Sequence, residues 1–245
     1  MPFSGSSREG AIGTSPPHPE SGTALAIYTS SKSARPFDAK HGFSGWGGAR
    51  NSTDRTSVAL TLRQASGIIE AAQFAYRVGL LFNRHVTIHL ERAGVSDSEA
   101  AAAIGAFLTL ARDWFRKQGK RTAWAWVREN GDGKGSHVHI LLHVPVCVKW
   151  SGWRLRRWLE RITGKPYQAG IIQTARIGGT TRAAATAPAA YQANLAAVVA
   201  YVIKGASPDA ARALGLERLE DGGRIIGKRA GWSQNVGLSA RCPSS

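Results

Sequence analysis

The order of apolar and polar residues predicts a strand between two helices in the first half of the chain. Residues 84–91 (RHVTIHLE) alternate with period two, the pattern of a half-buried strand, whereas residues 63–82 have the longer apolar repeat of a helix. Ser96 stands three residues before Glu99, which is the spacing of a capping box. Because basic residues and then Gly119 follow the next apolar repeat, a second helix is expected between Ser96 and Gly119.

Two more strands are predicted on either side of a glycine-rich turn. Residues 121–129 (RTAWAWVRE) and 137–144 (HVHILLHV) flank NGDGKGS, whose Asn-Gly and Asp-Gly pairs are typical of hairpins. A basic helix (151–164) and a strand within 167–176 follow. The order over residues 84–176 is therefore β-α-β-β-α-β, the split unit of a ferredoxin-like antiparallel sheet. We expect an α+β fold with helices on one face of the sheet and the active site on the other.

Side-chain parity gives this sheet two unlike faces. Successive residues of a strand point to opposite sides, so His137 and His139 share the face that the apolar residues of their strand avoid. If the turn spans residues 130–136, Glu129 lies directly across from His137 and on the same face. One carboxylate and two imidazoles then converge, and a slip of one residue in the register would separate them.

This group has the composition of a metal site. Two histidines at a spacing of two residues can bind one divalent ion, and a carboxylate from the neighbouring strand completes a set of three ligands. Mixed nitrogen and oxygen ligands suit Mg²⁺, Mn²⁺ or Zn²⁺, and positions left open for phosphate oxygens would let the ion act as a Lewis acid. The competing interpretation is a solvated polar face without a metal.

A helical run in residues 194–206 (NLAAVVAYVIKGA) carries a candidate nucleophile. Tyr201 and Lys204 are three residues apart and are therefore expected on one helix face. A phenol can be held in a covalent phosphodiester, and an ammonium can stabilise the charge of a phosphorane. Tyr191 lies about 80° around the helix and roughly 15 Å along it from Tyr201, so the two cannot share a site. We expect a single nucleophile, with Tyr191 and Tyr167 in structural or base-stacking roles.

The charge of the chain favours a polyanionic partner. The 245 residues include 32 Lys and Arg against 16 Asp and Glu, a formal net charge of +16, which makes nucleic acid the first candidate. Arg154 and Arg157 lie among tryptophans on the basic helix and are expected to follow phosphates. Lys228 and Arg229 lie in a glycine-rich basic segment that either closes over DNA or forms a terminal hairpin.

The histidine pair supports a resemblance to a known superfamily. His137-Val138-His139 resembles the His-hydrophobe-His signature of the HUH endonucleases, which include rolling-circle replication initiators, conjugative relaxases and certain single-strand transposases. Glu129, across the glycine-rich turn, resembles the acidic third ligand of parvoviral initiators. The strand HVTIHL stands where the first motif of the superfamily is expected, but it departs from the usual Phe-Thr-Leu-Thr.

The tyrosine extends the same resemblance. Tyr201 with Lys204 is similar to the Tyr-x-x-Lys motif, which follows the histidine motif in replication initiators. The resemblance covers about residues 80–206 and implies a metal-dependent enzyme that nicks and joins single-stranded DNA. Tyr201 would attack the scissile phosphate to give a 5′-phosphotyrosine and a free 3′-hydroxyl, and Lys204 would offset the developing charge.

The implied cofactor is Mg²⁺ or Mn²⁺. His137, His139 and Glu129 would hold the ion. His89, on the same face of the first strand, is the alternative third ligand or an orienting neighbour.

The leading functional expectation is initiation of rolling-circle replication of a plasmid or phage, because the histidine motif precedes the tyrosine in a compact chain. A relaxase or a single-strand transposase would share the chemistry, and a non-catalytic nucleic-acid-binding module is the alternative from a different class. The expected partner is single-stranded DNA at a replication origin, either open or folded as a hairpin. The chain contains no GxxxxGK[ST] loop, so a host helicase would act in trans. A second subunit is an open question.

Composition divides the chain into three parts. Residues 1–55 are rich in Ser, Gly and Pro and are expected to form a largely disordered leader. Residues 56–206 would form the nuclease domain, and residues 207–245 a basic, glycine-rich segment packed on or flanking it. Cys147 and Cys242 show no metal or disulfide spacing, and no apolar run is long enough for a membrane helix. We expect a soluble, cytoplasmic protein.

Overall fold

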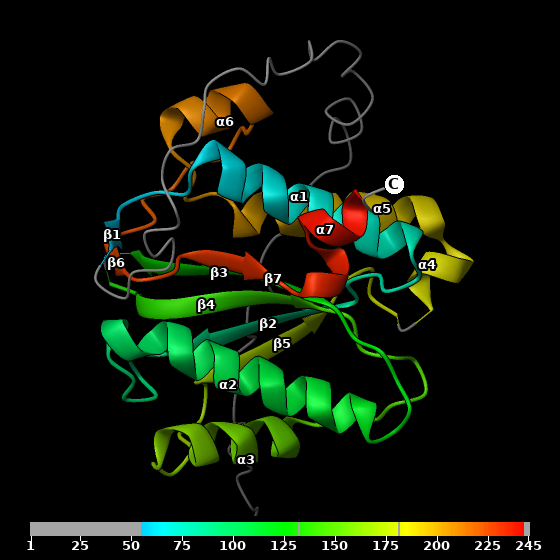
Figure 1. The fold of residues 1–245 in the computed structure, drawn as a ribbon, viewed down its shortest axis with the longest axis horizontal. Coiled ribbons are helices and arrows are strands. Elements are labelled where there is room, and N and C mark those ends of the chain that lie inside the picture. Colours follow the sequence, from blue (N-terminus) through cyan, green and yellow to red (C-terminus); the bar gives the residue numbers. More distant parts are fainter. Residues whose placement is uncertain (1–54, 132, 181, 243–245) are drawn as a thin grey trace, which may run out of the picture.

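An antiparallel sheet of five strands lies at the centre of the computed structural model, which describes residues 55–131, 133–180 and 182–242 (Figure 1). The strand order is β5-β2-β4-β3-β7, and every pair is antiparallel. The strands are β2 (Arg84–His89), β3 (Trp124–Gly131), β4 (Gly135–Leu142), β5 (Ile172–Arg176) and β7 (Ala230–Trp232). The α+β class is confirmed. The expected leader, residues 1–55, lies outside the described residues except for its last position.

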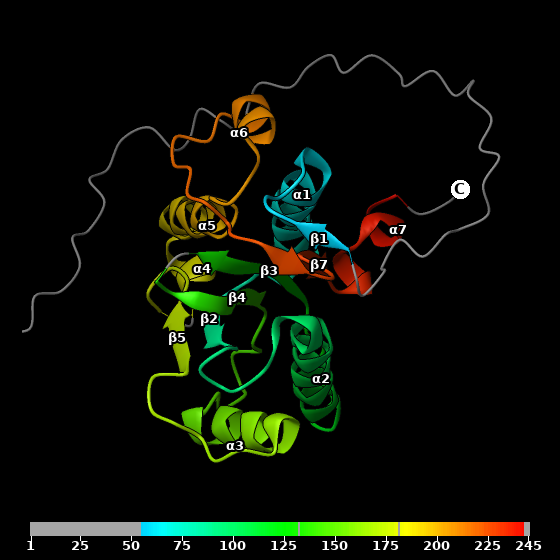
Figure 2. The ribbon, with the colours of Figure 1, turned by 90° about the vertical axis from the view of Figure 1, so that its left-hand side faces the viewer.

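Helices cover both faces of this sheet (Figures 1 and 2). The longer helices are α1 (Leu62–Arg77), α2 (Asp97–Arg116), α3 (Gly152–Thr163) and α5 (Pro188–Val202). The α2 and α3 helices pack on one face, and α1 and α5 pack on the other. The prediction of helices on one face alone is therefore wrong. The reason is that Val127 and Leu141 give the second face apolar surface of its own, which the buried stripe of α1 covers.

The remaining elements are short and flank this three-layer core. They are α4 (Ala183–Thr186), α6 (Pro208–Leu214), the 3₁₀-helix η2 (Gln234–Val236) and α7 (Leu238–Arg241). A separate two-stranded ladder pairs β1 (Thr56–Ser57) with β6 (Ile225–Ile226). Because β7 pairs with β3 and β6 pairs with β1, the C-terminal residues are built into the same structure as the earlier strands. In the part of the chain that the structure describes, no helix is both long and apolar enough to cross a bilayer.

Local signals explain the helix ends. Ser96 caps α2 in a capping box with Glu99, as its spacing predicts, and the helix ends at Arg116, before Gly119 turns the chain with φ of 65°. The α1 helix ends at Arg77, earlier than the apolar repeat suggests. Leu80 and Phe82 extend the apolar repeat beyond the end of the helix. They are not helical, but both are buried because the connection to β2 packs into the core.

The register of the β3–β4 hairpin places the candidate site. Glu129 lies opposite His137, as the turn length predicts, and the ladder continues to Gly131 opposite Gly135. On the other side of β4, His89 pairs with His137 and Thr87 pairs with His139. The apolar residues of alternate parity in β4 face α2 and α3, so the histidines face α1 and α5.

Candidate metal centre and nucleophile

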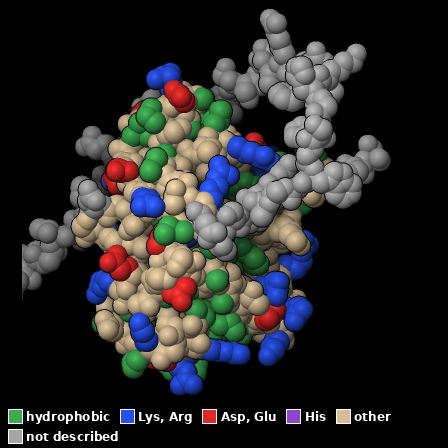
Figure 3. All heavy atoms as spheres, turned by 60° about the vertical axis from the view of Figure 1, so that its left-hand side comes forward, with side chains coloured by type: hydrophobic (Ala, Val, Ile, Leu, Met, Phe, Trp, Pro, Cys, Tyr) green, Lys and Arg blue, Asp and Glu red, His purple; other side chains and the backbone are tan. Residues whose placement is uncertain are grey.

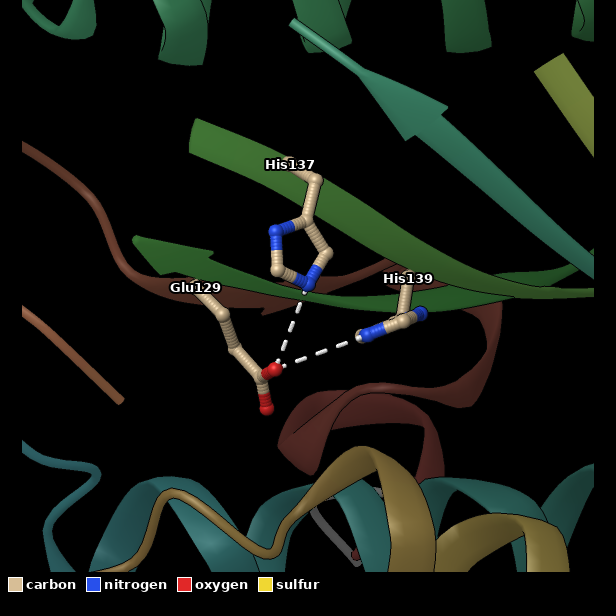
Figure 4. A group of neighbouring side chains, drawn as sticks. All are labelled: Glu129, His137 and His139. Carbon is tan, nitrogen blue, oxygen red and sulfur yellow. Dashed lines mark ion pairs between the residues drawn. The ribbon is translucent and has the colours of Figure 1, made fainter. Parts of the chain in front are cut away.

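Three side chains of the β3–β4 hairpin meet on the sheet face that α1 and α5 cover (Figure 4). Oε2 of Glu129 lies 3.4 Å from Nε2 of His137 and 3.6 Å from Nε2 of His139. One candidate ligand atom from each residue lies within 4.8 Å of the other two. All three are buried, with at most 4% of each residue exposed. The hairpin thus brings together the three predicted ligands in a group that could hold a metal ion.

Hydrogen bonds on the far side of each imidazole orient the two rings. Nδ1 of His137 lies 2.8 Å from the Gly135 carbonyl, to which an Nδ1–H donates, so Nε2 is left to face Glu129. Nδ1 of His139 lies 3.1 Å from Oγ1 of Thr87 and 3.2 Å from Nε2 of His85. This arrangement presents both Nε2 atoms, and hence their lone pairs, to the carboxylate.

The group also contains buried polar atoms whose hydrogen-bonding capacity is unused. Within the described ranges, neither Nε2 of His139 nor Oε1 of Glu129 has a hydrogen-bond partner. Such atoms are uncommon in protein interiors, because burying a polar atom without a partner is unfavourable. A divalent cation would satisfy both, and its preference for nitrogen and oxygen donors matches these residues. The residues present therefore fit a bound metal.

The protonation equilibria favour a metal-binding form of the ligands. Burial alone would raise the pKa of Glu129, but the adjacent side chains of His137, His139 and Lys204 outweigh it and hold that pKa well below its usual range. Burial lowers the pKa of His139, against the opposing effect of Glu129, and it lowers the pKa of His85 to about 4. The carboxylate is thus ionised and these imidazoles are neutral at neutral pH, which are the forms that bind metals.

Lys204 is part of the same buried group. Its Nζ forms an ion pair with Oε2 of Glu129 and lies 3.7 Å from Oε2 of Glu220. The prediction that Lys204 lies on the same helix as Tyr201 is wrong, because α5 ends at Val202 and Lys204 lies in the turn that follows, but the predicted proximity of the two side chains is confirmed. That turn directs the ammonium into the protein, where only 2% of the side chain is exposed.

Tyr201 lies on the last turn of α5, beside the candidate metal ligands. Its ring centroid is 5.3 Å from that of His139 and 6.1 Å from that of His85. Nζ of Lys204 lies 4.7 Å from the same centroid. Tyr201 is half-buried, and among the described residues no side chain or backbone group hydrogen-bonds to its hydroxyl. The predicted nucleophile and the predicted ligands are therefore neighbours.

A groove opens next to Tyr201, between α5 and the β2–β5 edge of the sheet. It encloses about 530 Å³. The lining is mostly polar or small and consists of His85, Thr87, Gln173, Thr174, Ala175, Asn194, Ala197, Val198 and Tyr201. The groove gives solvent, or an extended polymer, access to the side of the buried centre that carries the phenol.

His89 lies beside the centre without joining it. Its ring centroid is 5.7 Å from that of His137, with which it pairs across the strands, but its nitrogens lie outside the compact group of ligand atoms. The geometry favours Glu129 over His89 as the third ligand.

Two other tyrosines have structural contacts. The Tyr191 hydroxyl donates to the Phe82 carbonyl at 2.7 Å and is buried, and burial raises the pKa of this phenol. The Tyr167 hydroxyl accepts a hydrogen bond from the backbone N–H of Ile172.

The four basic residues expected to contact DNA have different surroundings. Arg154 packs 4.4 Å over the Trp114 ring, and Arg157 is exposed on α3. Lys228 is also exposed. Arg229 is buried, and it donates to carbonyls of Ser57, Gly222 and Gly223 as well as to Oγ of Ser57. The prediction that Arg229 contacts DNA is therefore wrong, because its guanidinium holds the C-terminal segment against the end of β1.

The α3 arginines lie far from the tyrosine in the architecture. The α3 helix covers the sheet face opposite to that of α5 (Figures 1 and 2). Lys and Arg side chains are spread over the surface, including the end of the molecule at which α3 lies (Figure 3). The fold thus brings together the ligands and the tyrosine but keeps the predicted DNA-contacting arginines apart from them.

Side-chain parity already predicts that Thr87 and His85 share the face of β2 that carries His89, and the structure places them there. Two other residues near the centre were not predicted from the sequence. Glu220 and Arg218 lie in an irregular segment between α6 and β6, which carries no periodic signal. Only the path of the chain in space brings that segment to Lys204 and Tyr201.

Comparisons of this chain with protein-family models, with curated proteins and with solved structures give no match.

Proposed function

We propose that this protein is a metal-dependent enzyme that nicks and joins single-stranded DNA, with Tyr201 as its nucleophile. The observation that carries the proposal is the position of Tyr201 beside a buried Glu-His-His group. A phenol at the edge of a candidate Lewis-acid site, with its hydroxyl unengaged, has the arrangement that covalent phosphoryl transfer requires. A purely structural histidine pair would not explain the unsatisfied ligand atoms.

The topology gives independent support. The β2-α2-β3-β4-α3-β5 segment has the strand order β5-β2-β4-β3 with α2 and α3 on one face, which is the arrangement of a ferredoxin-like split unit. We assign this segment to that fold, the one that the resemblance to HUH endonucleases implies. The α1 and α5 helices would be additions that enclose the active face.

The proposed reaction exchanges one phosphodiester for another. Oη of Tyr201 attacks the scissile phosphorus and its phenolic proton leaves, while the bond from phosphorus to the 3′-oxygen breaks and that oxygen takes up a proton. The products are a 5′-phosphotyrosine and a free 3′-hydroxyl. Attack by a 3′-hydroxyl on the phosphotyrosine reverses the step and joins two strands.

Each residue of the centre has a proposed task. His137, His139 and Glu129 would hold Mg²⁺ or Mn²⁺, which polarises the phosphate when bound. Thr87 and His85 keep His139 in the ligating orientation. Positioning and electrostatics are sufficient for this chemistry, because the phosphoryl group needs no covalent help beyond the nucleophile.

The proposed substrate is single-stranded DNA, which would bind in the groove beside Tyr201. The groove carries two threonines, Gln173 and Asn194 among small and apolar residues, and the net charge of +16 favours a polyanion. Among enzymes with this chemistry we favour a cytoplasmic initiator of rolling-circle replication of a plasmid or phage over a relaxase or a transposase, since the histidine motif precedes the tyrosine. Origin DNA and a separate host helicase are the partners that this role requires.

A covalent adduct tests the proposal directly. A pool of single-stranded oligonucleotides with a randomised centre and a 3′ label is incubated with the protein and Mn²⁺, then denatured and separated by electrophoresis. Because the phosphotyrosine retains the 3′ portion of the strand, the label is expected on the protein. Tyr201→Phe should abolish the labelled band, and Tyr167→Phe, the matched control, should retain it.

Two results would count against the proposal. A labelled band that persists in Tyr201→Phe would assign the nucleophile to another residue. Binding of the pool without any adduct, across Mg²⁺ and Mn²⁺, would favour a non-catalytic nucleic-acid-binding module.

A further inference from the structure

The ammonium of Lys204 is poorly placed to contact a substrate phosphate. Only 2% of its side chain is exposed, and its charge is paired with Glu129, one of the candidate metal ligands. A cation that neutralises a ligand on the protein side of the centre cannot also contact the substrate on the solvent side. Apart from the metal ion, the proposed reaction therefore needs another residue to place a positive charge at the phosphate.

Arg218 has the exposure that Lys204 lacks, and it also lies beside the Tyr201 ring. Its Cζ lies 5.4 Å from the centroid of the Tyr201 ring, and 61% of its side chain is exposed. Nε donates to Oε1 of Glu220 at 2.8 Å, and Nη2 donates to the same oxygen. A guanidinium has five N–H donors, so within the described part of the chain three remain free to bind phosphate oxygens.

The backbone around Arg218 is fixed to the metal centre. The Glu220 N–H donates to the Lys204 carbonyl at 3.0 Å, and Oε2 of Glu220 faces the ammonium of Lys204. Gly223 lies so close to the hairpin that an added Cβ would be 1.7 Å from the Asn130 carbonyl oxygen, and its φ is +64°. The segment is thus held at two points, at the turn after α5 and at β3, which sets the location of Arg218 before any substrate binds.

We propose that Arg218 is a catalytic residue that binds the scissile phosphate of single-stranded DNA as Tyr201 attacks it. The inference rests on the proposed function and reassigns to Arg218 the charge-offsetting role that the resemblance gives to Lys204. As the bond from Oη to phosphorus forms and the bond from phosphorus to the 3′-oxygen breaks, negative charge gathers on the non-bridging oxygens. The planar guanidinium binds two of these oxygens at once, a geometry that a single ammonium cannot reproduce.

The test measures the rate of adduct formation in a single turnover, at saturating Mn²⁺ and with a 3′-labelled oligonucleotide selected from the pool by the wild-type protein. Arg218→Ala should slow the reaction about 10²-fold, the usual effect of removing one donor from a developing oxyanion. Arg218→Lys should recover part of the rate, and free guanidinium should partly rescue Arg218→Ala. Arg212→Ala is the matched control, because Arg212 is similarly exposed, with 79% of its side chain accessible, and lies six positions earlier.

The outcomes separate the two proposals. If the wild-type protein forms an adduct and Arg218→Ala matches Arg212→Ala, the Arg218 inference is overturned and the nuclease proposal stands. If Arg218→Ala weakens oligonucleotide binding but reacts normally once saturated, Arg218 binds DNA away from the reacting phosphate and the inference also fails. If no wild-type adduct forms, both proposals fail together.

Discussion

At the scale of single residues, the central question is which side chains bind the metal. Glu129, His137 and His139 form the compact group, whereas His89 lies beside it. Glu129→Gln and His137→Ala should each weaken Mn²⁺ binding by at least about 100-fold, more than the 10–100-fold typical of residues that only orient a ligand. His89→Ala should bind Mn²⁺ within a few fold of the wild type. Calorimetric titration with Mn²⁺ measures the affinities of the wild type and the three variants. If His89→Ala bound Mn²⁺ more weakly than Glu129→Gln, His89 would be the third ligand instead of Glu129.

The buried ion pair predicts an unusual response to metal. Lys204 and a bound cation both compensate the charge of Glu129, so removal of the ammonium leaves a carboxylate that only a metal can neutralise. In a chelator, Lys204→Met should therefore melt at a lower temperature than the wild type. Mn²⁺ should raise the melting temperature of Lys204→Met by more than it raises that of the wild type. Thermal unfolding with and without Mn²⁺ measures both shifts. An equal metal-induced shift in the two proteins would show that Lys204 does not compete with the ion for Glu129.

Buried histidines predict that acid destabilises the fold. Burial lowers the pKa of His143, despite its hydrogen bond to the Leu81 carbonyl, and lowers that of His85 to about 4. Below about pH 6.5 the unfolded chain takes up protons at these positions that the folded chain does not, so stability falls as the pH falls from 6.5 towards 4. Melting temperatures in a chelator should decrease across this window. His143→Gln should flatten the decrease, and an unchanged slope would exclude a contribution from that residue.

At the scale of secondary structure elements, local patterns account for much of the fold. Parity and turn length predict the pairing of Glu129 with His137, because a two-residue repeat and a short hairpin leave few alternative registers. The capping box predicts where α2 begins. Local patterns could not predict that α1 and α5 cover the second face of the sheet. Periodicity shows that a helix has an apolar side, but it does not show which surface that side packs against.

The same limit explains the missing members of the site. Arg218 and Glu220 lie in a segment without helical or strand periodicity, and its position depends on long-range contacts such as that of Gly223 with Asn130. Lys204 was found by spacing but was assigned to a helix that ends before it, because the apolar residues after Tyr201 continue the helical pattern while packing into the core.

A buried ion pair joins three elements and predicts a large effect on stability. Nη2 of Arg128, on β3, pairs with Asp97 at the start of α2, and the Asp97 carboxylate also accepts from the backbone N–H of Ile226 on β6. Asp97→Ala leaves the fully buried Arg128 without its counter-charge and should cost about 3 kcal/mol. Ser96→Ala removes only a helix cap and should cost about 1 kcal/mol. Urea unfolding measures both, and similar losses would indicate that the ion pair contributes little beyond the cap.

At the scale of the whole molecule, positive charge is distributed over surfaces that cannot all contact the same few nucleotides. Tyr201 and its groove lie on the α5 side of the sheet, and the exposed guanidinium of Arg157 lies on α3, on the opposite side. A strand just long enough to fill the groove would not reach α3, whereas a longer strand could extend around the sheet edge. Charge at α3 should therefore add to affinity for long strands without taking part in the reaction.

This separation predicts different length dependences for two variants. For a long single strand, Arg157→Ala should lower affinity and reduce the slope of log affinity against log salt by about 0.7, the value for one phosphate contact. For an oligonucleotide that only fills the groove, Arg157→Ala should change neither the affinity nor the single-turnover rate. Arg218→Ala, in contrast, should reduce the single-turnover rate for both the short and the long strand. Fluorescence anisotropy across a salt series gives the slopes. A slower reaction of the short strand in Arg157→Ala would contradict this prediction. It would mean that a short strand bound at Tyr201 also contacts α3.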